Sequence, residues 1–213
     1  MLLDSEDCQL VLVDYQSRLM PAMAESTFVL ANALRLARFA EAFGVPLWGT
    51  EQAPDKLGEN PAEWRGMCRQ TLVKNSFSAC ADGLTHLLRP PVRGKQNSQQ
   101  GGEQRGNARS LPKHLQKAVP PPLPEVPSRN TVVLAGCEAH VCLMQTALDL
   151  LEEEFDVWVV TDACSSRTER NRDAAFDRLA ANGAELVTTE MVAFEWLRDA
   201  HHEAFRSVQA LIR

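Results

Sequence analysis

Short apolar runs without polar alternation recur along this chain, and most are followed by a segment with helical spacing. Strands that lack polar alternation are typical of a parallel sheet covered by helices on both faces. The runs predicted as strands are residues 9–13, 45–50, 71–73, 131–136, 156–163 and 185–189. The pattern predicts an α/β fold: a doubly wound three-layer α/β/α arrangement around a mostly parallel six-stranded sheet.

The segments between the predicted strands carry the apolar spacing of helices. One helix face is formed by Val29, Ala33, Leu36, Ala37 and Ala40. Gly44 is predicted to end this helix. Further helices are expected at residues 78–88, at a segment whose apolar face is Met144, Ala147, Leu148 and Leu151, at residues 168–182, and in two stretches at the end of the chain.

Residues 90–130 differ in composition from the rest of the chain. They are rich in Pro, Gly, Gln, Ser and Arg, and nearly free of aromatic and β-branched residues, so they cannot bury enough apolar surface to offset the entropy of ordering. We interpret residues 1–213 as one domain with a largely disordered insertion at 90–130, and a short helix is compatible with residues 110–119. The insertion holds seven Lys and Arg against two Glu. A basic arm for a partner or an RNA fits this balance, but a tolerated surface loop is favoured.

Charge and composition exclude several classes of function. The formal net charge of −6 argues against nucleic acid as the main partner, since binding phosphates requires an excess of cations. The apolar runs are far shorter than the roughly 20 residues of a membrane-spanning helix. The acidic N-terminus does not resemble a secretory signal, and six cysteines without a CxxC pair indicate reduced thiols. We therefore expect a cytoplasmic protein with a small-molecule substrate, without a nucleic-acid or membrane partner.

Three polar residues follow three of the predicted strands. Asp14 follows the first, Lys74 the third, and Cys142 lies six residues past the fourth, in the first turn of a helix. In a doubly wound sheet, ligands bind outside the carboxyl ends of the strands. A helix N-terminus and a nearby ammonium lower a thiol pKa, and a carboxylate can accept the thiol proton. Each residue alone also fits a structural role as cap, solvated cation or core thiol, so the hypothesis requires all three together.

Four sequence blocks carry a family resemblance. LVLVDYQ, TLVKNSFSA, LAGCEAHVCLMQTALDLL and VWVVTDACSSR resemble successive signatures of the isochorismatase-like cysteine hydrolase superfamily, which includes nicotinamidases and related amide hydrolases. The resemblance covers the chain apart from residues 90–130 and implies an isochorismatase-like, Rossmann-like fold. GTEQAPDKLG and FRSVQALIR resemble most the small isochorismatase domain-containing proteins. We also expect a homo-oligomer.

The resemblance assigns roles to the three polar residues. It implies that the Cys142 thiolate attacks a carbonyl carbon, that Asp14 acts as general base and then as acid, and that Lys74 supports the charges of its neighbours. Water then hydrolyses the thioester. It also implies an oxyanion hole made by the backbone N–H groups of Glu138 and Cys142, with a cis peptide between Cys137 and Glu138.

The resemblance also bears on the metal and on the substrate pocket. Metal-dependent nicotinamidases carry an Asp and two His after the second strand, whereas GTEQAPDKLGEN contains no His, so no metal or other cofactor is expected. Its scattered carboxylates, Glu51, Asp55 and Glu59, are interpreted as a solvated surface. Candidate pocket residues, each of which also fits a core position, are Gln16, Met20, Trp48 and Phe77.

Three functional hypotheses remain open. True isochorismatases cleave a vinyl ether without the thiol, so Cys142 favours a metal-independent cysteine hydrolase that acts on a small amide or related C–N bond through a thioester. The alternative is a catalytically weak or inactive protein of the same fold that acts as a binding or oligomeric scaffold. The third is a redox pair of Cys137 and Cys142, which the absence of a CxxC motif disfavours.

Overall fold

A single parallel sheet organises the chain. The fold is seen in a computed structural model that describes residues 1–90 and 129–212. The strands, in the spatial order β3-β2-β1-β4-β5-β6, are all paired in parallel. Their bounds are β1 Cys8–Val13, β2 Leu47–Gln52, β3 Gln70–Lys74, β4 Thr131–Gly136, β5 Asp156–Val160 and β6 Glu185–Val187. The predicted doubly wound α/β fold is confirmed, with a sheet that is wholly parallel.

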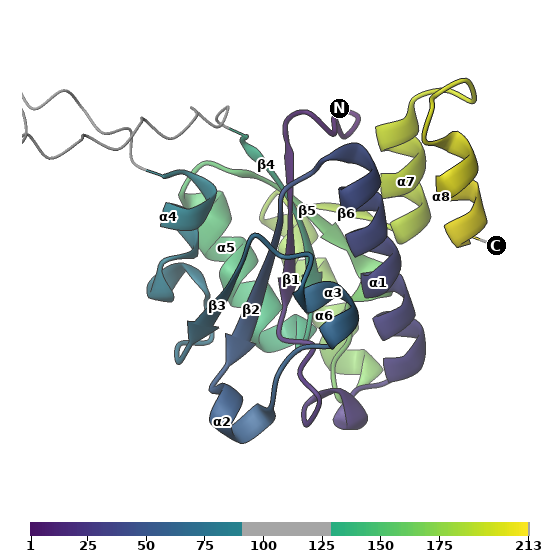
Figure 1. The fold of residues 1–213 in the computed structure, drawn as a ribbon. Helices are drawn as coiled ribbons and strands as arrows, with labels where there is room; N and C mark the ends of the chain where they lie inside the picture. The colour runs from purple at the N-terminus through teal and green to yellow at the C-terminus, as the bar shows by residue number, and fades with distance from the viewer. Residues whose placement is uncertain (91–128, 213) are drawn as a thin grey trace, which may run out of the picture. The chain divides into compact units, whose positions relative to one another are not determined.

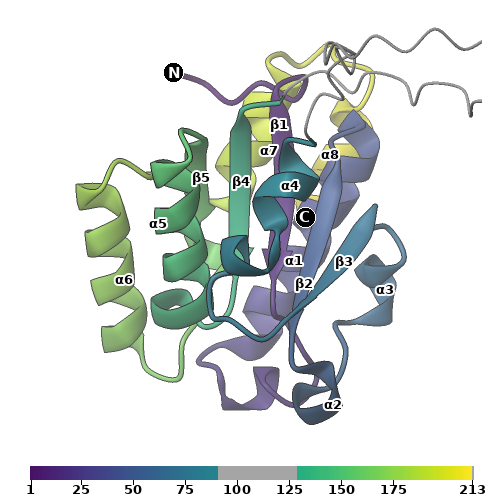
Figure 2. The ribbon, with the colours of Figure 1, turned by 90° about the vertical axis from the view of Figure 1, so that its left-hand side faces the viewer.

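Helices cover both faces of the sheet. Their bounds are α1 Ser26–Phe43, α2 Pro54–Leu57, α3 Ala62–Arg65, α4 Leu84–Leu88, α5 Met144–Glu152, α6 Glu169–Ala181, α7 Thr189–Leu197 and α8 Phe205–Ile212. In Figure 1, α4 and α5 lie on one side of the sheet, and α1 and α7 lie on the other. Figure 2, which looks onto the first of these faces, shows α6 beside α5. None of the helices within the described ranges is long and apolar enough to cross a membrane.

The best-predicted element is α1. All five residues of its predicted apolar face are buried, and Asn32 and Phe39 are buried with them. Gly44 ends the helix as expected: its φ of 64° is left-handed, and its N–H donates to the carbonyls of Ala40 and Glu41. The periodicity is a reliable guide here because the buried positions recur at helical spacing from Val29 to Ala40.

Other elements depart from their predicted bounds. The helix expected at 78–88 consists of a 3₁₀ turn, Cys80–Asp82, and α4, separated by Gly83 at a φ of 103°. The fifth strand ends at Val160 and continues as the 3₁₀ turn Thr161–Ala163. The sixth strand ends at Val187, because the Thr188 hydroxyl accepts the N–H of Met191 and begins α7.

The buried face of α5 is rotated from the predicted one. Its buried residues are Thr146, Ala147 and Leu150, whereas Met144, Leu148 and Leu151 are only partly buried. The Thr146 hydroxyl is buried because it accepts the Ala79 N–H at 3.0 Å. A polar residue with a specific partner thus replaces part of the apolar stripe that periodicity predicts.

The predicted insertion at 90–130, with its possible helix at 110–119, lies outside the described residues except for its first position and its last two. The proposed domain organisation therefore stays a prediction. Within the described part, the chain proceeds from β1 toward β3 and then returns to β4 before moving toward β6. The switch in direction lies between β1 and β4, which is where ligands bind in sheets of this kind.

Candidate active site

Asp14, Lys74 and Cys142 come together at the carboxyl end of the sheet. Asp14 directly follows β1, Lys74 is the last residue of β3, and Cys142 lies in the π-helical turn Ala139–Leu143 after β4. The Lys74 Nζ lies 2.7 Å from the Asp14 Oδ2, and both side chains are fully buried. The Cys142 thiol interacts with both of these side chains. A potential base, a cation and a nucleophile thus share one buried cluster.

Neutral groups complete the surroundings of the ion pair. The Thr50 hydroxyl donates to Asp14 Oδ1 at 2.6 Å, and the Asp14 N–H donates to the Thr50 carbonyl at 3.2 Å. The Lys74 ammonium donates to Gln52 Oε1 at 2.7 Å, to the Phe77 carbonyl at 3.1 Å and to the Ser76 carbonyl at 3.3 Å. These bonds are the kind that a buried ion pair requires, because the pair's own attraction rarely repays its desolvation.

The pKa of Cys142 differs from the sequence-based expectation. Burial, followed by the Asp14 carboxylate, raises the pKa of this thiol to about 12, although the Lys74 ammonium acts to lower it. The expected lowering was wrong because the thiol is only 6% exposed and lies within the π-helical turn, so desolvation outweighs the cation. At neutral pH the sulfur therefore carries its proton, next to a carboxylate that can accept it.

The segment between Cys137 and Cys142 forms an arch over the strand ends. The predicted cis peptide joins Cys137 to Glu138. The Glu138 carbonyl accepts the N–H groups of Val141 (3.0 Å) and Leu143 (3.3 Å), and neither bond uses the N–H of Cys142. Within residues 1–90 and 129–212, the Glu138 N–H has no hydrogen-bond acceptor. This arrangement leaves a backbone donor available beside the cluster.

Gly136 is required where the arch leaves β4. A Cβ at this position would lie 2.3 Å from the Val13 carbonyl oxygen, and the backbone φ is 157°. Val13 and Gly136 are paired in register, so β1 and β4 end at the same level. This close approach brings the residue after β1, Asp14, beside the start of the arch.

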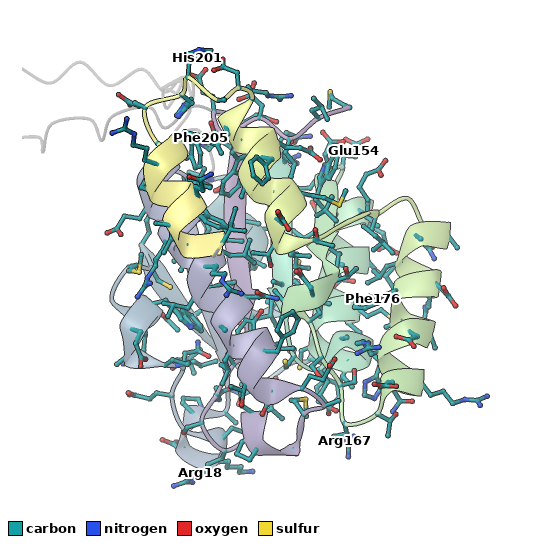
Figure 3. The ribbon with its side chains drawn as sticks, turned by 90° about the vertical axis from the view of Figure 1, so that its right-hand side faces the viewer. Arg18, Glu154, Arg167, Phe176, His201 and Phe205 are labelled. Atoms are coloured by element: carbon teal, nitrogen blue, oxygen red, sulfur yellow. The ribbon has the colours of Figure 1, made fainter. Side chains whose placement is uncertain are left out.

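The arch is also fixed from its outer side. The Ala139 N–H donates to the Ser165 carbonyl at 2.7 Å, and His140 Nδ1 lies 3.0 Å from the Ser166 hydroxyl. Arg167 Nε donates to Glu138 Oε2 at 2.9 Å from a side chain that is 62% exposed. Figure 3 shows Arg167 and Arg18 at the same end of the molecule, the carboxyl end of the strands. The segment after β5 thus supports the rim of the cluster.

Two of the four predicted pocket residues, Gln16 and Met20, are buried in the segment that follows β1. Met20 begins a 3₁₀ turn and is 4% exposed. Gln16 is fully buried, and its side-chain amide is engaged with backbone: it donates to the carbonyls of Gln52 (3.0 Å) and Gly58 (2.6 Å) and accepts the Gln52 N–H (2.8 Å). Gln16 thus braces the chain after β2.

The other two pocket candidates lie in different surroundings. The structure does not bring Trp48 to the cluster: it pairs in register with Val11, and its indole N–H donates to Gln9 Oε1 at 3.1 Å. The reason is that β2 extends to Gln52, so Trp48 lies well before the carboxyl end of its strand. The Phe77 carbonyl contacts Lys74, and the residue as a whole is 56% exposed.

One of the carboxylates interpreted as solvated is buried. Glu51 is 1% exposed, and its Oε1 accepts the Asn60 N–H at 2.8 Å and lies 3.0 Å from Arg65 Nε. The interpretation was wrong for Glu51 because it belongs to β2 and not to the loop after it. Among the residues that the structure describes, no group of three or more His, Cys, Asp or Glu side chains is placed to hold a metal ion.

Sequence reasoning missed three residues around the ion pair. Thr50 and Gln52, two residues apart on β2, contact Asp14 and Lys74 respectively. Asp82 Oδ2 accepts the N–H groups of Ser76 (2.9 Å) and Asn75 (3.2 Å), and these bonds lower the pKa of its carboxyl group. The rule that found Asp14 looks at residues that follow a strand, and it missed Thr50 and Gln52 because both lie within β2.

All six cysteines are free thiols in the structure. Burial raises the pKa of Cys137 well above its ordinary value, with Cys164 and Asp14 adding to the rise and the Ser165 N–H opposing it. The hypothesis of a Cys137–Cys142 redox pair stays a prediction.

Comparisons with known proteins agree with this architecture. An isochorismatase domain model matches residues 111–191. Isochorismatase domain-containing protein 2 of Xenopus laevis is 31% identical over 203 residues, which are 95% of this chain and 82% of that protein. Among solved structures, the MAR1 ribonuclease of Caenorhabditis elegans is 25% identical with a TM-score of 0.77, covering 100% of this chain and 92% of that one. The YcaC gene product of Escherichia coli, an octameric hydrolase of unknown specificity, is 24% identical with a TM-score of 0.77, covering 100% and 89%. The chain therefore belongs to the isochorismatase domain family.

Proposed function

We propose that this protein is a metal-independent cysteine hydrolase that cleaves a small amide or a related C–N bond through a thioester on Cys142. The observation that carries the proposal is the buried Asp14–Lys74 ion pair, 2.7 Å across, with the Cys142 thiol near enough for both partners to act on its pKa. Membership of the isochorismatase domain family favours hydrolase activity in general. The bond and the substrate are the proposed part.

In the acylation step, the Cys142 Sγ attacks the carbonyl carbon while the Asp14 carboxylate takes the thiol proton. Because the thiol pKa is raised to about 12, proton transfer accompanies the attack and does not precede it. The carbonyl electrons move to oxygen, and the N–H groups of Glu138 and Cys142 are the proposed donors to this oxyanion. A preorganised donor of this kind contributes roughly 3 to 4 kcal/mol to the transition state.

Collapse of the tetrahedral intermediate breaks the C–N bond. The leaving amine takes the proton that Asp14 accepted, and the acyl group stays on sulfur as a thioester. Water then attacks this thioester, Asp14 accepts a proton from the water, and the departing sulfur recovers it. The net reaction converts an amide and water into a carboxylic acid and an amine. The Lys74 ammonium remains beside Asp14, whose carboxylate carries the negative charge before the attack and again in the thioester intermediate.

The experiment is a screen of small amides and carbamoyl compounds, with intact-mass detection of an acyl group on the protein. Cys142→Ala should abolish both turnover and the adduct. Cys137→Ala, five residues away and also buried, is the matched control and should keep substantial activity. Full turnover in Cys142→Ala would overturn the proposal. No turnover and no adduct across the panel would favour the scaffold alternative.

Independence from metal is tested by the same assay after dialysis against a chelator. We expect unchanged turnover, because Glu51, the most buried carboxylate after Asp14 among the described residues, is engaged by Arg65 and Asn60. Restoration of activity by one divalent cation would contradict this part of the proposal.

We propose a homo-oligomer in the cytoplasm as the working form. Exposed apolar side chains at Val73 and Phe77 on one side and Met191 and Phe194 on another support association. The Escherichia coli protein, which has the same fold, is described as an octamer. Light scattering on the purified chain measures the oligomeric state directly.

RNA, the substrate in the name of the Caenorhabditis elegans protein, is expected to remain uncleaved by this protein, because its net charge is −6.

A further inference from the structure

Gln52 occupies a particular place beside the ion pair. Its side-chain Oε1 accepts a hydrogen bond from the Lys74 ammonium at 2.7 Å, as short as the contact between Lys74 and Asp14. Its own backbone is clamped by Gln16, which accepts the Gln52 N–H at 2.8 Å and donates to its carbonyl at 3.0 Å. A third bond, from Gln16 to the Gly58 carbonyl at 2.6 Å, ties this clamp to the loop after α2.

The orientation of the Gln52 amide follows from its partners. Its Nε2 donates to the Asn75 carbonyl at 2.8 Å, so the oxygen faces the ammonium. The reversed amide would place an N–H donor against the ammonium and an oxygen against a carbonyl, which would leave both contacts without a proton to share. Gln52 therefore presents an acceptor to Lys74 and at the same time holds the segment that carries the Ser76 and Phe77 carbonyls.

The groups that accept hydrogen bonds from the Lys74 ammonium are neutral, apart from the Asp14 carboxylate. Among the described residues, the ammonium contacts the amide oxygen of Gln52, two backbone carbonyls and a single carboxylate, that of Asp14. A second carboxylate at this distance would compete strongly for the cation, since charges interact more strongly in a buried site than in water. A neutral acceptor anchors the ammonium without cancelling its effect on its neighbours.

We propose that Gln52, oriented by Gln16, is a positioning residue that holds the Lys74 ammonium against Asp14 and the Cys142 thiol through a neutral acceptor. The proposal rests on the function proposed above and reassigns Gln16 from a substrate contact to a positioning residue. Both residues act through Lys74, and neither touches the reacting atoms.

A change of charge at position 52 should change the pKa of the Cys142 thiol. The charged groups that act on Cys142 are Asp14, at the end of β1, and Lys74, at the end of β3. In Gln52→Glu, the new carboxylate draws the ammonium away and adds an anion near the sulfur, so the thiol becomes harder to ionise. In Gln52→Leu no charge changes, and the ammonium keeps Asp14 as its partner.

The test is the pH dependence of Cys142 alkylation by iodoacetamide in the full chain, read by peptide mass spectrometry. At a fixed pH below the thiol pKa, we expect alkylation of Gln52→Glu to be about tenfold slower than wild type, which corresponds to a shift of one pKa unit. Gln70→Glu, which adds the same charge at an exposed position of the neighbouring strand β3, is the matched control and should stay within about twofold of wild type. Equal rates in Gln52→Glu and Gln70→Glu would overturn the proposal.

A second variant covers the case in which Gln52→Glu does not fold. Gln16→Met keeps every charge and releases the clamp on Gln52. If Gln16 is a positioning residue, kcat falls by about tenfold and KM changes little; a rise in KM at unchanged kcat would mark a substrate contact and overturn this part. Because alkylation needs no substrate, slower alkylation of Gln52→Glu without any amide turnover would reject the proposed hydrolase and still support the role of Gln52. Conversely, if amide turnover depends on Cys142 but Gln52→Glu is alkylated as fast as wild type, the proposed hydrolase is supported and the role of Gln52 is rejected.

Discussion

Each end of the sheet contains a buried glutamine, but only the glutamine at the carboxyl end lies beside buried charged groups. At the amino end, Gln9 donates to the carbonyls of Leu88 (3.1 Å) and Arg129 (3.0 Å) and accepts the indole N–H of Trp48 (3.1 Å). At the carboxyl end, Gln16 makes similar bonds to the backbone, but they brace a buried ion pair beside a thiol. Figure 3 marks these ends with Glu154 at one and Arg18 and Arg167 at the other.

This difference suggests that the amino end of the sheet contributes mainly to stability and the carboxyl end mainly to catalysis. At the amino end the glutamine's polar atoms are paired with neutral groups, which is how a buried polar residue stabilises a fold. At the carboxyl end two charges are buried, an arrangement that an apolar pair could often replace without loss of stability. Variants at the amino end should therefore lower stability without lowering turnover, and variants at the carboxyl end should lower turnover. The following predictions test that division, beginning with the largest effect.

Lys74→Met should have the largest effect because it leaves Asp14 buried without its cation. We expect the free energy of unfolding to fall by about 3 to 5 kcal/mol, measured by urea denaturation. The double variant Asp14→Asn with Lys74→Met removes both charges and should recover most of that stability but no turnover. A double variant as unstable as Lys74→Met would contradict the interpretation of these residues as one ion pair.

Asp14→Asn should lower turnover by roughly 10²- to 10⁴-fold, the range expected for loss of a general base. The same variant should lower the pKa of Cys142 from about 12, because the Asp14 carboxylate is one of the groups that raise it. Alkylation at pH 9 should then be faster than in wild type, although turnover is slower. An unchanged thiol pKa would show that Asp14 and Cys142 are not coupled.

Trp48→Phe tests the amino end. It removes the indole N–H that Gln9 Oε1 accepts, and Gln9 is only 3% exposed, so we expect a loss of about 1 to 2 kcal/mol in unfolding free energy. Turnover should stay within about twofold of wild type. A marked rise in KM would instead support the sequence-based prediction that Trp48 lines the substrate pocket.

Asp82→Asn should have the smallest effect, and one that depends on pH. The pKa of Asp82 is lowered from 3.8 by the N–H groups of Ser76 and Asn75, so the ionised carboxylate is favoured in the folded chain. Its stabilising contribution is present above the pKa of the unfolded chain and is lost as pH falls through the lower pKa of the folded chain. Wild type should thus be slightly more stable than Asp82→Asn at pH 7, and this difference should vanish at strongly acidic pH in thermal denaturation.

Several parts of the molecule could be predicted from sequence because they depend on local pattern. The runs that became β1 and β4 are buried at every position, so an unbroken apolar run was a sufficient signal. Asp14 and Lys74 were found by their places directly after strand patterns. Trp48 was misplaced for a related reason: the end of β2, Thr50 to Gln52, is polar, and no apolar run marks where that strand stops.

The properties of the cluster could not be predicted in this way. The helix pattern placed Cys142 at a helix N-terminus with a lowered pKa, but burial and Asp14 reverse the direction of the shift. The π-helical turn depends on the Leu143 N–H reaching the Glu138 carbonyl, and the arch that contains them is supported by Ser165 from another strand end. No local pattern contains that information.

The sequence by itself determined the parallel α/β architecture, the buried face of α1, and the positions of Asp14 and Lys74 at the carboxyl ends of β1 and β3. These features could be predicted because burial and periodicity are reflected in the order of apolar and polar residues. Only the tertiary structure decided that Asp14 and Lys74 pair across the end of β2, that Gln16 and Gln52 brace the pair, and that the Cys142 thiol stays protonated. The physical reason is that these properties depend on strand order and on the groups that displace water around each side chain, and both bring together residues that are distant in sequence.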